Sequence, residues 1–390
     1  MTNKSNIVVT CSKRITLVLE KEIESLGYSV LNTSINSVQT EGTLKDCMKL
    51  NYYLRCGNQV LFELKKFRAT EPKQLYKALL EIEWDQYISK FGYFSVVSTG
   101  FNEHVDNFMY VNQLCKDAIA DFFNNKYEVR PNSGPEKNKV VIRLYWDEDT
   151  AIVYLDTSGE TLTKHNYRKA KHDAPMQEAL AAAIINASRW NRETNFINPM
   201  CGSGTIAIEA ALMASNRFPG AFRNNYSFMH ILNYKEEEWE EIRREGKSKY
   251  TKPNLKIIAT DISEKALDAA YNNAQTAGVD HLIEFKKCDF RDTDVPEADG
   301  GVIMINPEYG ERLGEVEELA EIYTEIGNWF KQKCGGYTGY VFTGNMDLGK
   351  KIGLKPKRKM EFYNGKIDCR LLEFELYQGT RKFKKTEENS

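Results

Sequence analysis

Three apolar segments in the second half of the chain end in residues that can bind a nucleotide-like ligand. The segment TNFIN runs into PMCGSGT, and the helical pattern TIAIEAALMA follows at once. Gly202 and Gly204 can adopt backbone angles that are closed to other residues, and they let a ligand approach the main chain. Free N–H groups and the dipole at the start of the helix favour carboxylates or phosphates. An ordinary tight turn is the alternative for this loop taken alone.

Acidic residues end the next two apolar segments. LKIIATD ends at Asp261, and LIEFKKCD ends at Asp289. An acid after the second strand commonly binds a ribose diol in nucleotide-type folds, and ligands of open α/β sheets bind at the carboxyl edge of the sheet. Helix capping is the alternative role for each acid. The third glycine of the dinucleotide fingerprint is absent and Asp261 comes late, so a dinucleotide cofactor is disfavoured.

A fourth apolar segment, GVIMI, ends in NPEYGERLG. An Asn-Pro pair that stops a strand and is followed by Tyr and Gly is unusual if the segment serves folding alone. The candidate residues are Asn306, Pro307 and Tyr309, and a simple strand-terminating turn is the alternative.

These motifs together resemble a known family. N-P-M-C-G-S-G-T, T-D-I-S and N-P-x-Y-G-E-R-L are similar to the S-adenosylmethionine-dependent RNA methyltransferases that carry a THUMP domain and make N2-methylguanine in 23S ribosomal RNA, the RlmL type. The resemblance spans nearly the whole chain and includes DTSGETLTKHNYR, APMQEALAAA and NGKIDCRLLEF. N-P-x-Y alone also occurs in families that methylate adenine or glutamine.

The resemblance implies roles for the Asn-Pro segment. The side-chain oxygen of Asn306 and the carbonyl of Pro307 would accept from the guanine amine and orient its lone pair. Tyr309 would stack on a base rotated out of its RNA context. Glu308 stands where the family has a second proline. It is expected to pair with Arg312, to accept from the amine or to face solvent.

The resemblance also implies a binding site for S-adenosylmethionine. Asp261 would bind the ribose hydroxyls and Asp289 the adenine amine. Cys201 could instead be a nucleophile, but an amine target needs no covalent attack, so a small buried thiol is expected. The implied cofactor-binding residues are Pro199, Cys201, Gly202, Ser203, Gly204, Thr205, Asp261, Ile262, Asp289 and Asn306.

RNA contacts are predicted in a polar, basic and aromatic segment before the catalytic domain. Cations with an interleaved aromatic suit phosphate contact and base stacking, and a solvated linker is the alternative. The candidates are Lys164, His165, Tyr167, Arg168, Lys169 and Lys171. A second cationic run, KKIGLKPKRKM, has the same two readings.

Composition indicates a soluble cytoplasmic protein. Apolar residues make up 42% and charged residues 28% of the 390 residues, and the net charge of −2 gives no global attraction to a polyanion. The eight cysteines include no C-x-x-C pair, so we expect neither a disulfide framework nor a metal site. No signal peptide or membrane span is expected. The oligomeric state is not predicted.

Segment patterns predict an α+β region up to about residue 158, a linker over 159–176 and repeated strand-helix units from Gln177 on. The resemblance implies that these regions are a ferredoxin-like segment over 1–50, a THUMP RNA-binding domain over 51–158 and a methyltransferase domain over 177–390. The fold class is α/β. A Rossmann-like class I methyltransferase, with a mostly parallel seven-stranded sheet and a C-terminal antiparallel hairpin, follows an α+β region. Hairpins are predicted to turn at Asp147–Asp149 and at Asn364–Gly365, the latter as type I′. The insert NYKEEEWEEIRREGKSKY is predicted to be a charged surface helix.

The predicted function is methyl transfer to guanine N2 of large-subunit ribosomal RNA. Three alternatives stay open at this point: the same chemistry on transfer RNA, methylation of adenine N6 in nucleic acid, and an RNA-binding relative with impaired catalysis.

Overall fold

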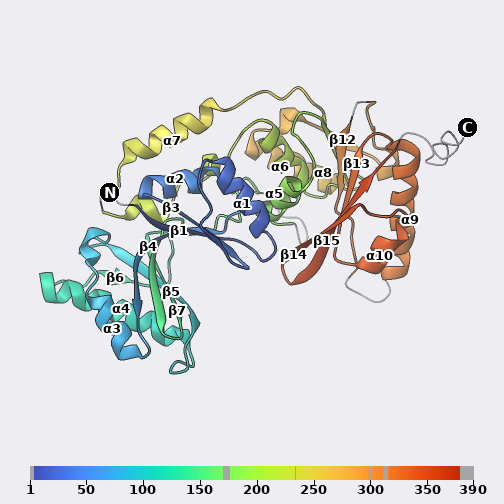
Figure 1. Ribbon diagram of the computed structural model, residues 1–390. Helices are drawn as coiled ribbons and strands as arrows, with labels where there is room; N and C mark the ends of the chain where they lie inside the picture. Colours follow the sequence, from blue (N-terminus) through green and yellow to red (C-terminus); the bar gives the residue numbers. More distant parts are fainter. Residues whose placement is uncertain (1–3, 170–175, 233, 298–299, 311–314, 378–390) are drawn as a thin grey trace, which may run out of the picture. The chain divides into compact units, whose positions relative to one another are not determined.

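The computed structural model describes residues 4–169, 176–232, 234–297, 300–310 and 315–377 (Figure 1). The chain divides into two compact units. Unit 1 contains the chain up to Ser12, Leu19–Thr163 and Pro219–Ser248, and unit 2 contains Lys13–Val18, Lys164–Phe218 and the chain from Lys249 on. This division differs from the predicted domains at residues 219–248, which were assigned to the methyltransferase domain.

One sheet of eight strands runs through the described part of unit 1, in the order β2-β3-β1-β4-β8-β7-β5-β6. Its pairs are antiparallel except that β5 is parallel to both β6 and β7. The strands are β1 (Ser5–Thr10), β2 (Asn32–Thr33), β3 (Ser37–Gly42), β4 (Gln59–Arg68), β5 (Tyr93–Phe101), β6 (Asn132–Ser133), β7 (Val140–Asp147) and β8 (Thr150–Asp156).

Local sequence signals explain several helix ends in this region. A capping box joins Thr43 to Asp46 at the start of α2, and a proline occupies the first turn of α3. The 20-residue helix α4 was not predicted. The helices are α1 (Thr16–Ser25), α2 (Leu44–Tyr53), α3 (Pro72–Leu80), α4 (Phe108–Tyr127) and α7 (Glu236–Ser248), with 3-10 turns η1 (Trp84–Gln86), η2 (Pro219–Phe222) and η3 (Ser227–His230).

The charged insert forms α7, as predicted, but one face of this helix is buried. Trp239 and Gly246 face α2, and α7 lies beside α2 in Figure 1. A side chain at Gly246 would place its Cβ 2.1 Å from Cε1 of Tyr52. Tyr226 and Trp239 pack edge to face with ring centroids 5.3 Å apart. The insert is therefore part of the aromatic core of unit 1.

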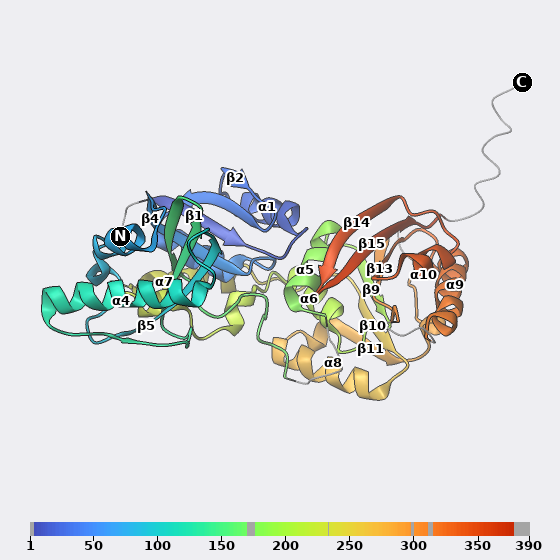
Figure 2. The same cartoon turned by 90° about the horizontal axis from the view of Figure 1, so that it is seen from below.

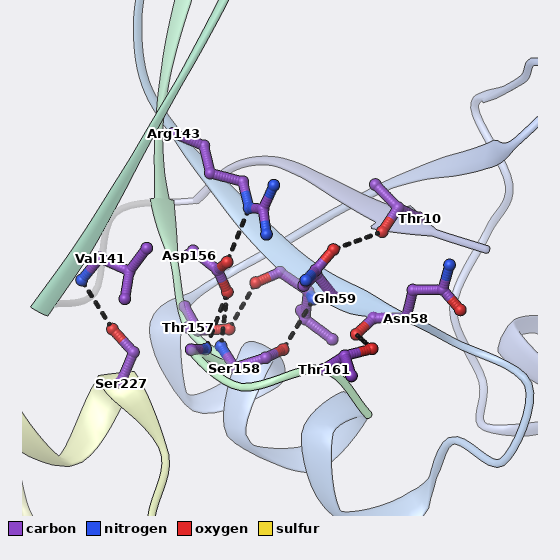
Figure 3. Close-up of polar contacts among 12 residues, drawn as sticks. Thr10, Asn58, Gln59, Val141, Arg143, Asp156, Thr157, Ser158, Thr161 and Ser227 are labelled. Carbon is purple, nitrogen blue, oxygen red and sulfur yellow. Dashed lines mark hydrogen bonds and ion pairs between the residues drawn. The ribbon is translucent and has the colours of Figure 1, made fainter. Parts of the chain in front are cut away.

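A buried polar network closes unit 1 at the end of β8 (Figure 3). Arg143 donates from Nε to one carboxylate oxygen of Asp156 (2.7 Å), and the backbone N–H groups of Ser158 and Gly159 donate to the other (3.0 Å each). Ser227 of η3 accepts from the N–H of Val141 (3.1 Å). Hydrogen bonds of the segment DTSG therefore fix the end of β8, and the buried carboxylate of Asp156 is paired with Arg143.

Asn51 joins this network to α2. Its Nδ2 donates to Thr157 Oγ1 (2.8 Å) and to the carbonyl of Cys47 (2.9 Å), and its Oδ1 accepts from Ser158 Oγ (2.7 Å). Only 1% of the Asn51 surface is exposed. Removing this carboxamide would cost the Thr157 and Ser158 hydroxyl groups one hydrogen bond each, although each keeps one with the backbone of Val60.

Asn51→Ala is expected to destabilise unit 1 by about 2–4 kcal/mol, because it removes three buried hydrogen bonds and opens a cavity. Urea unfolding, with hydrogen exchange of unit 1 peptides to localise the effect, measures this loss. Asn125→Ala makes the same chemical change on the exposed face of α4 and should stay within about 0.5 kcal/mol of the parent. Equal effects of the two substitutions would contradict a structural role for the network.

The described strands of unit 2 form a seven-stranded sheet in the order β11-β10-β9-β12-β13-β15-β14. The first five are parallel and the last two are antiparallel to their neighbours, as the sequence predicts. The strands are β9 (Asn195–Pro199), β10 (Ile257–Asp261), β11 (Ile283–Lys287), β12 (Gly301–Ile305), β13 (Thr338–Thr343), β14 (Arg358–Asn364) and β15 (Ile367–Glu375).

Helices cover both faces of this sheet (Figure 2). α5, α6 and α8 lie together on one face, and α9 and α10 lie on the other. Tyr323 and Trp329 of α9 pack into a buried cluster with Ile303 and Ile305 of β12. The helices are α5 (Glu178–Ala187), α6 (Thr205–Ala214), α8 (Glu264–Ala277), α9 (Glu315–Lys333) and α10 (Met346–Lys351), with 3-10 turns η4 (Asp280–Leu282) and η5 (Phe290–Asp292).

The strand order sets the place of a ligand site. The chain runs from β9 outward through β10 to β11 and then returns to β12 on the other side of β9. The order therefore switches between β9 and β12, where the carboxyl ends of parallel strands leave a crevice for ligands. The predicted α/β fold class is confirmed.

The two predicted hairpins differ in outcome. Asp147 pairs with Thr150, so the first turn lies where it was predicted. In the second, Asn364 pairs with Ile367, which makes Gly365 and Lys366 the turn residues. Among these residues only Gly365 has a positive φ, of 60°. The type I′ prediction is wrong: a positive φ at the first turn residue alone is typical of type II′, and Asn364 is the last strand residue.

Across the part of the chain that the structure describes, no helix combines the length and apolar character needed to span a bilayer.

Candidate active site

The glycine loop between β9 and α6 presents open main chain at the strand switch. Gly202 has a φ of 55°, and a Cβ added there would meet nothing within 4 Å. Gly204 has a φ of 77°, and a Cβ there would lie 2.8 Å from Cβ of Ala270 on α8. One glycine therefore leaves space for a ligand, and the other lets α6 pack closely on α8. Met200 also has a positive φ, of 52°, which is strained for a side chain of this size.

Asp261 fastens this loop to the end of β10. Its Oδ2 accepts from the N–H of Gly202 and its Oδ1 accepts from the N–H of Ser263, both at 2.9 Å. An ionised carboxylate has about four acceptor positions, so two remain for hydroxyl groups of a ligand. Ile262 follows with 70% of its surface exposed, an apolar side chain open to solvent beside the loop.

Asp289 lies at the end of β11 and is already engaged. The guanidinium of Arg291 donates to both carboxylate oxygens (2.8 and 2.9 Å), and the N–H of Arg291 donates to Oδ1 (2.9 Å). These hydrogen bonds hold the pKa of Asp289 below its usual range. An adenine amine would have to share this carboxylate with Arg291, and the adenine contact stays a prediction.

The Asn-Pro segment after β12 carries an unsatisfied acceptor. The side-chain oxygen of Asn306 is buried, and no described residue donates a hydrogen bond to it. Pro307 is buried, Glu308 is exposed and Tyr309 is half-buried. A buried amide oxygen without a donor is costly unless a ligand supplies one. The predicted pairing of Glu308 with Arg312 lies outside the described residues.

Asn198 is a site residue that sequence reasoning missed. Its Nδ2 donates to the carbonyl of Met304 (2.8 Å), which ties β9 to β12 at the switch. Its own side-chain oxygen is buried without a donor among the described residues, as in Asn306. An Asn-Pro pair ends β9 and another directly follows β12, and this repeated dipeptide was the signal that could have identified Asn198.

The segment predicted to contact RNA is largely part of the fold. His165 and Tyr167 are each 1% exposed. Nδ1 of His165 lies 2.7 Å from a carboxylate oxygen of Glu209 on α6, and burial raises the pKa of the Tyr167 phenol. The RNA-contact prediction is wrong for these two residues, because phosphates and bases cannot reach them. Lys164 and Lys169 are exposed, and RNA contact stays a prediction for them, while Lys171 lies outside the described residues.

Arg168 supports the glycine loop. Its Nη2 donates to Thr205 Oγ1 (2.9 Å) at the start of α6 and to the carbonyl of Met176 (2.7 Å). Its side chain is 16% exposed and lies 3.6 Å from the carboxylate of Glu178. The guanidinium is therefore used within unit 2, which opposes its predicted contact with RNA.

Arg168→Met is expected to lower the melting temperature and weaken cofactor binding about tenfold, because a buried hydrogen-bonded cation is lost. The slope of log K for RNA against log salt should not change. Lys164→Met, at an exposed position, should leave the melting temperature unchanged. If Arg168→Met instead reduced the slope of log K against log salt by the amount expected for one lost phosphate contact and left the melting temperature unchanged, Arg168 would have to be interpreted as an RNA contact.

Cys201 has the environment of a structural thiol. Burial is the main cause that raises the pKa of Cys201, and the charge of Asp261 adds to the shift. A thiol of raised pKa is a poor nucleophile, because the thiolate is the reactive form. The raised pKa is unfavourable for a nucleophile, as expected, but the residue is only half-buried and not fully buried as predicted.

The second cationic run is partly neutralised. Lys350 pairs with Asp347 and Lys357 pairs with Glu375, each at 2.8 Å. Arg358 pairs with Glu373. The exposed cations Lys351, Lys355 and Lys359 are left as candidates for RNA contact. No group of three or more potential metal ligands is arranged to hold an ion within the described ranges.

Comparisons with protein families match three parts of the chain. Residues 165–373 match the family described as RMKL-like, methyltransferase domain. Residues 6–61 match the RlmL ferredoxin-like domain, and residues 69–156 match the THUMP domain.

Individual relatives extend the match over nearly the whole chain. Ribosomal RNA large subunit methyltransferase K/L of Syntrophotalea carbinolica is 32% identical over 377 residues, covering 94% of this chain and 53% of that protein. The chain thus spans about half the length of the curated relatives it matches. The crystal structure of SMU.472 complexed with SAH superposes with a TM-score of 0.88 at 27% identity, covering 97% of this chain and 100% of that one. A structure from Listeria monocytogenes, described as a predicted N6-adenine-specific DNA methylase, has a TM-score of 0.85 at 27% identity and covers 97% of both chains.

Proposed function

Because the chain belongs to the RMKL-like methyltransferase family, we propose that it transfers a methyl group from S-adenosylmethionine to the exocyclic N2 amine of a guanine in large-subunit ribosomal RNA. The single observation that carries this proposal is the buried, unsatisfied side-chain oxygen of Asn306 at the strand switch. This oxygen can accept a hydrogen bond from a ligand, and the target amine carries two N–H groups that can donate one.

The residues at the strand switch fit the cofactor. Gly202 leaves open space above the main chain, Asp261 has acceptor capacity left for ribose hydroxyls, and the oxygen of Asn198 lacks a donor. Ile262 offers an exposed apolar surface on which an adenine ring can pack. S-adenosylmethionine supplies an electrophilic methyl carbon bonded to a sulfonium sulfur. Asp261, Gly202 and their neighbours would hold it at the carboxyl edge of β9 and β10.

The Asn-Pro segment supplies orientation and no strong base. The amine of guanine is a weak nucleophile, because its lone pair is delocalised into the ring. The side-chain oxygen of Asn306 and the carbonyl of Pro307 would accept hydrogen bonds from the two N–H groups of the amine. These hydrogen bonds would direct the nitrogen lone pair toward the methyl group. Holding the two reacting atoms in line gives most of the acceleration in such a site. Tyr309 would stack on the flipped base.

The RNA substrate is inferred from the relatives and the N-terminal region. Two relatives that each match 94% of the chain are named ribosomal RNA large subunit methyltransferase K/L, and residues 69–156 match the THUMP domain. THUMP would grip folded RNA while the catalytic unit acts on one base. All eight cysteines are free thiols, which fits the cytoplasmic location that we also propose.

Labelled-methyl transfer to total RNA, followed by nucleoside analysis, tests this function. Mapping of methylated guanines in cells with and without the gene then identifies the nucleotide. N2-methylguanosine in the large ribosomal RNA supports the proposal. N2-methylguanosine in transfer RNA would mean that transfer RNA is the substrate, and N6-methyladenosine would mean that adenine is the target base. The adenine outcome is included because the Listeria relative is described as adenine-specific. Cofactor binding without any transfer would indicate an RNA-binding relative that has lost catalysis.

A further inference from the structure

We propose that Asn364, at the end of the C-terminal hairpin, positions Tyr309 for base stacking, and that Gly344 forms the surface against which the tyrosine ring rests. This inference rests on the proposed function, because it assigns these two residues to the orientation of the substrate base. Neither residue belongs to the Asn-Pro segment or to the glycine loop.

A direct contact joins the hairpin to the tyrosine. Nδ2 of Asn364 donates to the phenol oxygen of Tyr309 over 2.8 Å. The two residues are 55 positions apart in the sequence and both are partly buried. Burial raises the pKa of the Cys369 thiol on β15, and hydrogen bonds with the Asn364 backbone and with Tyr309 oppose that shift, so the phenol lies near the turn of the hairpin.

Gly344 lies against the ring itself. A Cβ at this position would be 3.0 Å from both Cδ2 and Cε2 of Tyr309 and 2.7 Å from Cγ2 of Ile367. Gly344 is not among the glycines with a positive φ. Its backbone could therefore accept another residue, and the close approach of Ile367 and of the Tyr309 ring is the reason that only glycine fits there.

The segment around Gly344 is fixed at both ends. Thr343, at the end of β13, accepts through its Oγ1 from the N–H of Asn345 (3.1 Å). The Asn345 side chain accepts from the N–H groups of Asp347 and Leu348 and so caps α10. A capped helix and a strand end hold the glycine in place, which makes it a rigid support.

Asn364 is available for this contact because it is not a turn residue. It pairs with Ile367 as the last residue of β14, and the turn is made by Gly365 and Lys366. A strand residue has a defined side-chain direction. The shift of the turn by one residue therefore gives the carboxamide a fixed place from which to donate to Tyr309.

These contacts limit the motion of the tyrosine ring. One side of the ring packs on Gly344 and the hydroxyl group is held by Asn364, while the side chain stays partly exposed. A ring that is already oriented loses less conformational freedom when a base stacks on it. Without these supports the base would stack on a ring that samples more than one orientation, and alignment of the amine would suffer.

A double-mutant cycle tests the positioning role. Asn364→Ala is expected to lower kcat/KM for RNA by about five- to tenfold, the effect of one net hydrogen bond, while the Kd for S-adenosylmethionine is unchanged. In a Tyr309→Phe background, Asn364→Ala should have no further effect, because the hydroxyl group through which it acts is gone. Lys366→Ala, at an exposed turn position of the same hairpin, should match the parent.

Gly344→Ala gives a second and independent measurement. Its methyl group would press on the Tyr309 ring, so it should lower kcat/KM for RNA with Asn364 intact and leave cofactor binding unchanged. Additive losses in the cycle, or loss of cofactor binding in Asn364→Ala, would overturn the positioning role while methyl transfer by the parent upholds the proposed function. Absence of any methyl transfer by the parent chain would overturn both.

Discussion

Asn306→Ala is expected to lower kcat for methyl transfer about 10²- to 10³-fold, the loss typical of removing one preorganised polar group from an active site. The buried oxygen of Asn306 has no donor among the described residues, so folding does not depend on it. Stability should therefore stay constant or rise, because an unsatisfied polar atom is removed. Single-turnover kinetics with labelled cofactor and thermal unfolding measure both effects.

The control for this substitution is Asn272→Ala on the exposed face of α8. It makes the same chemical change in the same unit and should leave kcat within about twofold of the parent. A parent-like kcat in Asn306→Ala would mean that the amide does not orient the amine, and the proposed chemistry would have to be abandoned.

Asp261→Ala is expected to raise the Kd for S-adenosylmethionine about 10²-fold or more. The carboxylate accepts from the N–H groups of Gly202 and Ser263, and hydrogen bonds to a charged group contribute roughly 1.5–3 kcal/mol each. Its loss releases the glycine loop and also removes the acceptors proposed for the ribose. Isothermal titration with S-adenosylhomocysteine measures the change without any turnover.

Asp268→Ala separates this effect from a general loss of negative charge. Asp268 lies on α8 within the same unit, and its side chain is exposed. The Asp268→Ala variant should have the same Kd for S-adenosylhomocysteine and the same melting temperature as the parent. If Asp261→Ala bound the cofactor as tightly as Asp268→Ala does, the assigned cofactor site would be incorrect.

Much of the catalytic fold could be predicted because its signals are local. Apolar strands, a glycine loop and acids at the ends of two strands are short patterns, and the parallel arrangement follows from alternating strands and helices. The helix α4 was missed although its sequence, FMYVNQLCKDAIADFFNNKY, is long enough to be read. The final turn was misplaced by one residue, because Asn-Gly strongly favours a turn with asparagine inside it.

The segment after Thr163 shows why the site was harder to predict than the fold. Histidine, tyrosine and arginine next to lysines are the residues that contact RNA at surfaces, so composition indicated an exposed segment. Burial of His165 against Glu209 depends on a helix 44 positions away. A contact of this range has no local signature. The hydrogen bonds from Arg291 to Asp289, only two residues apart, could have been predicted from the sequence.

Residues 219–248 also limit how the gene can be divided. A fragment ending at Thr163 would expose Tyr52 and the apolar side of α2, because Tyr226, Trp239 and Gly246 would be missing. The catalytic half, in turn, would keep a loop whose aromatic residues have lost their core. Unit 1 is thus completed by chain that is synthesised after the glycine loop. Neither half is an autonomous module that evolution or an engineer could transplant by a single cut.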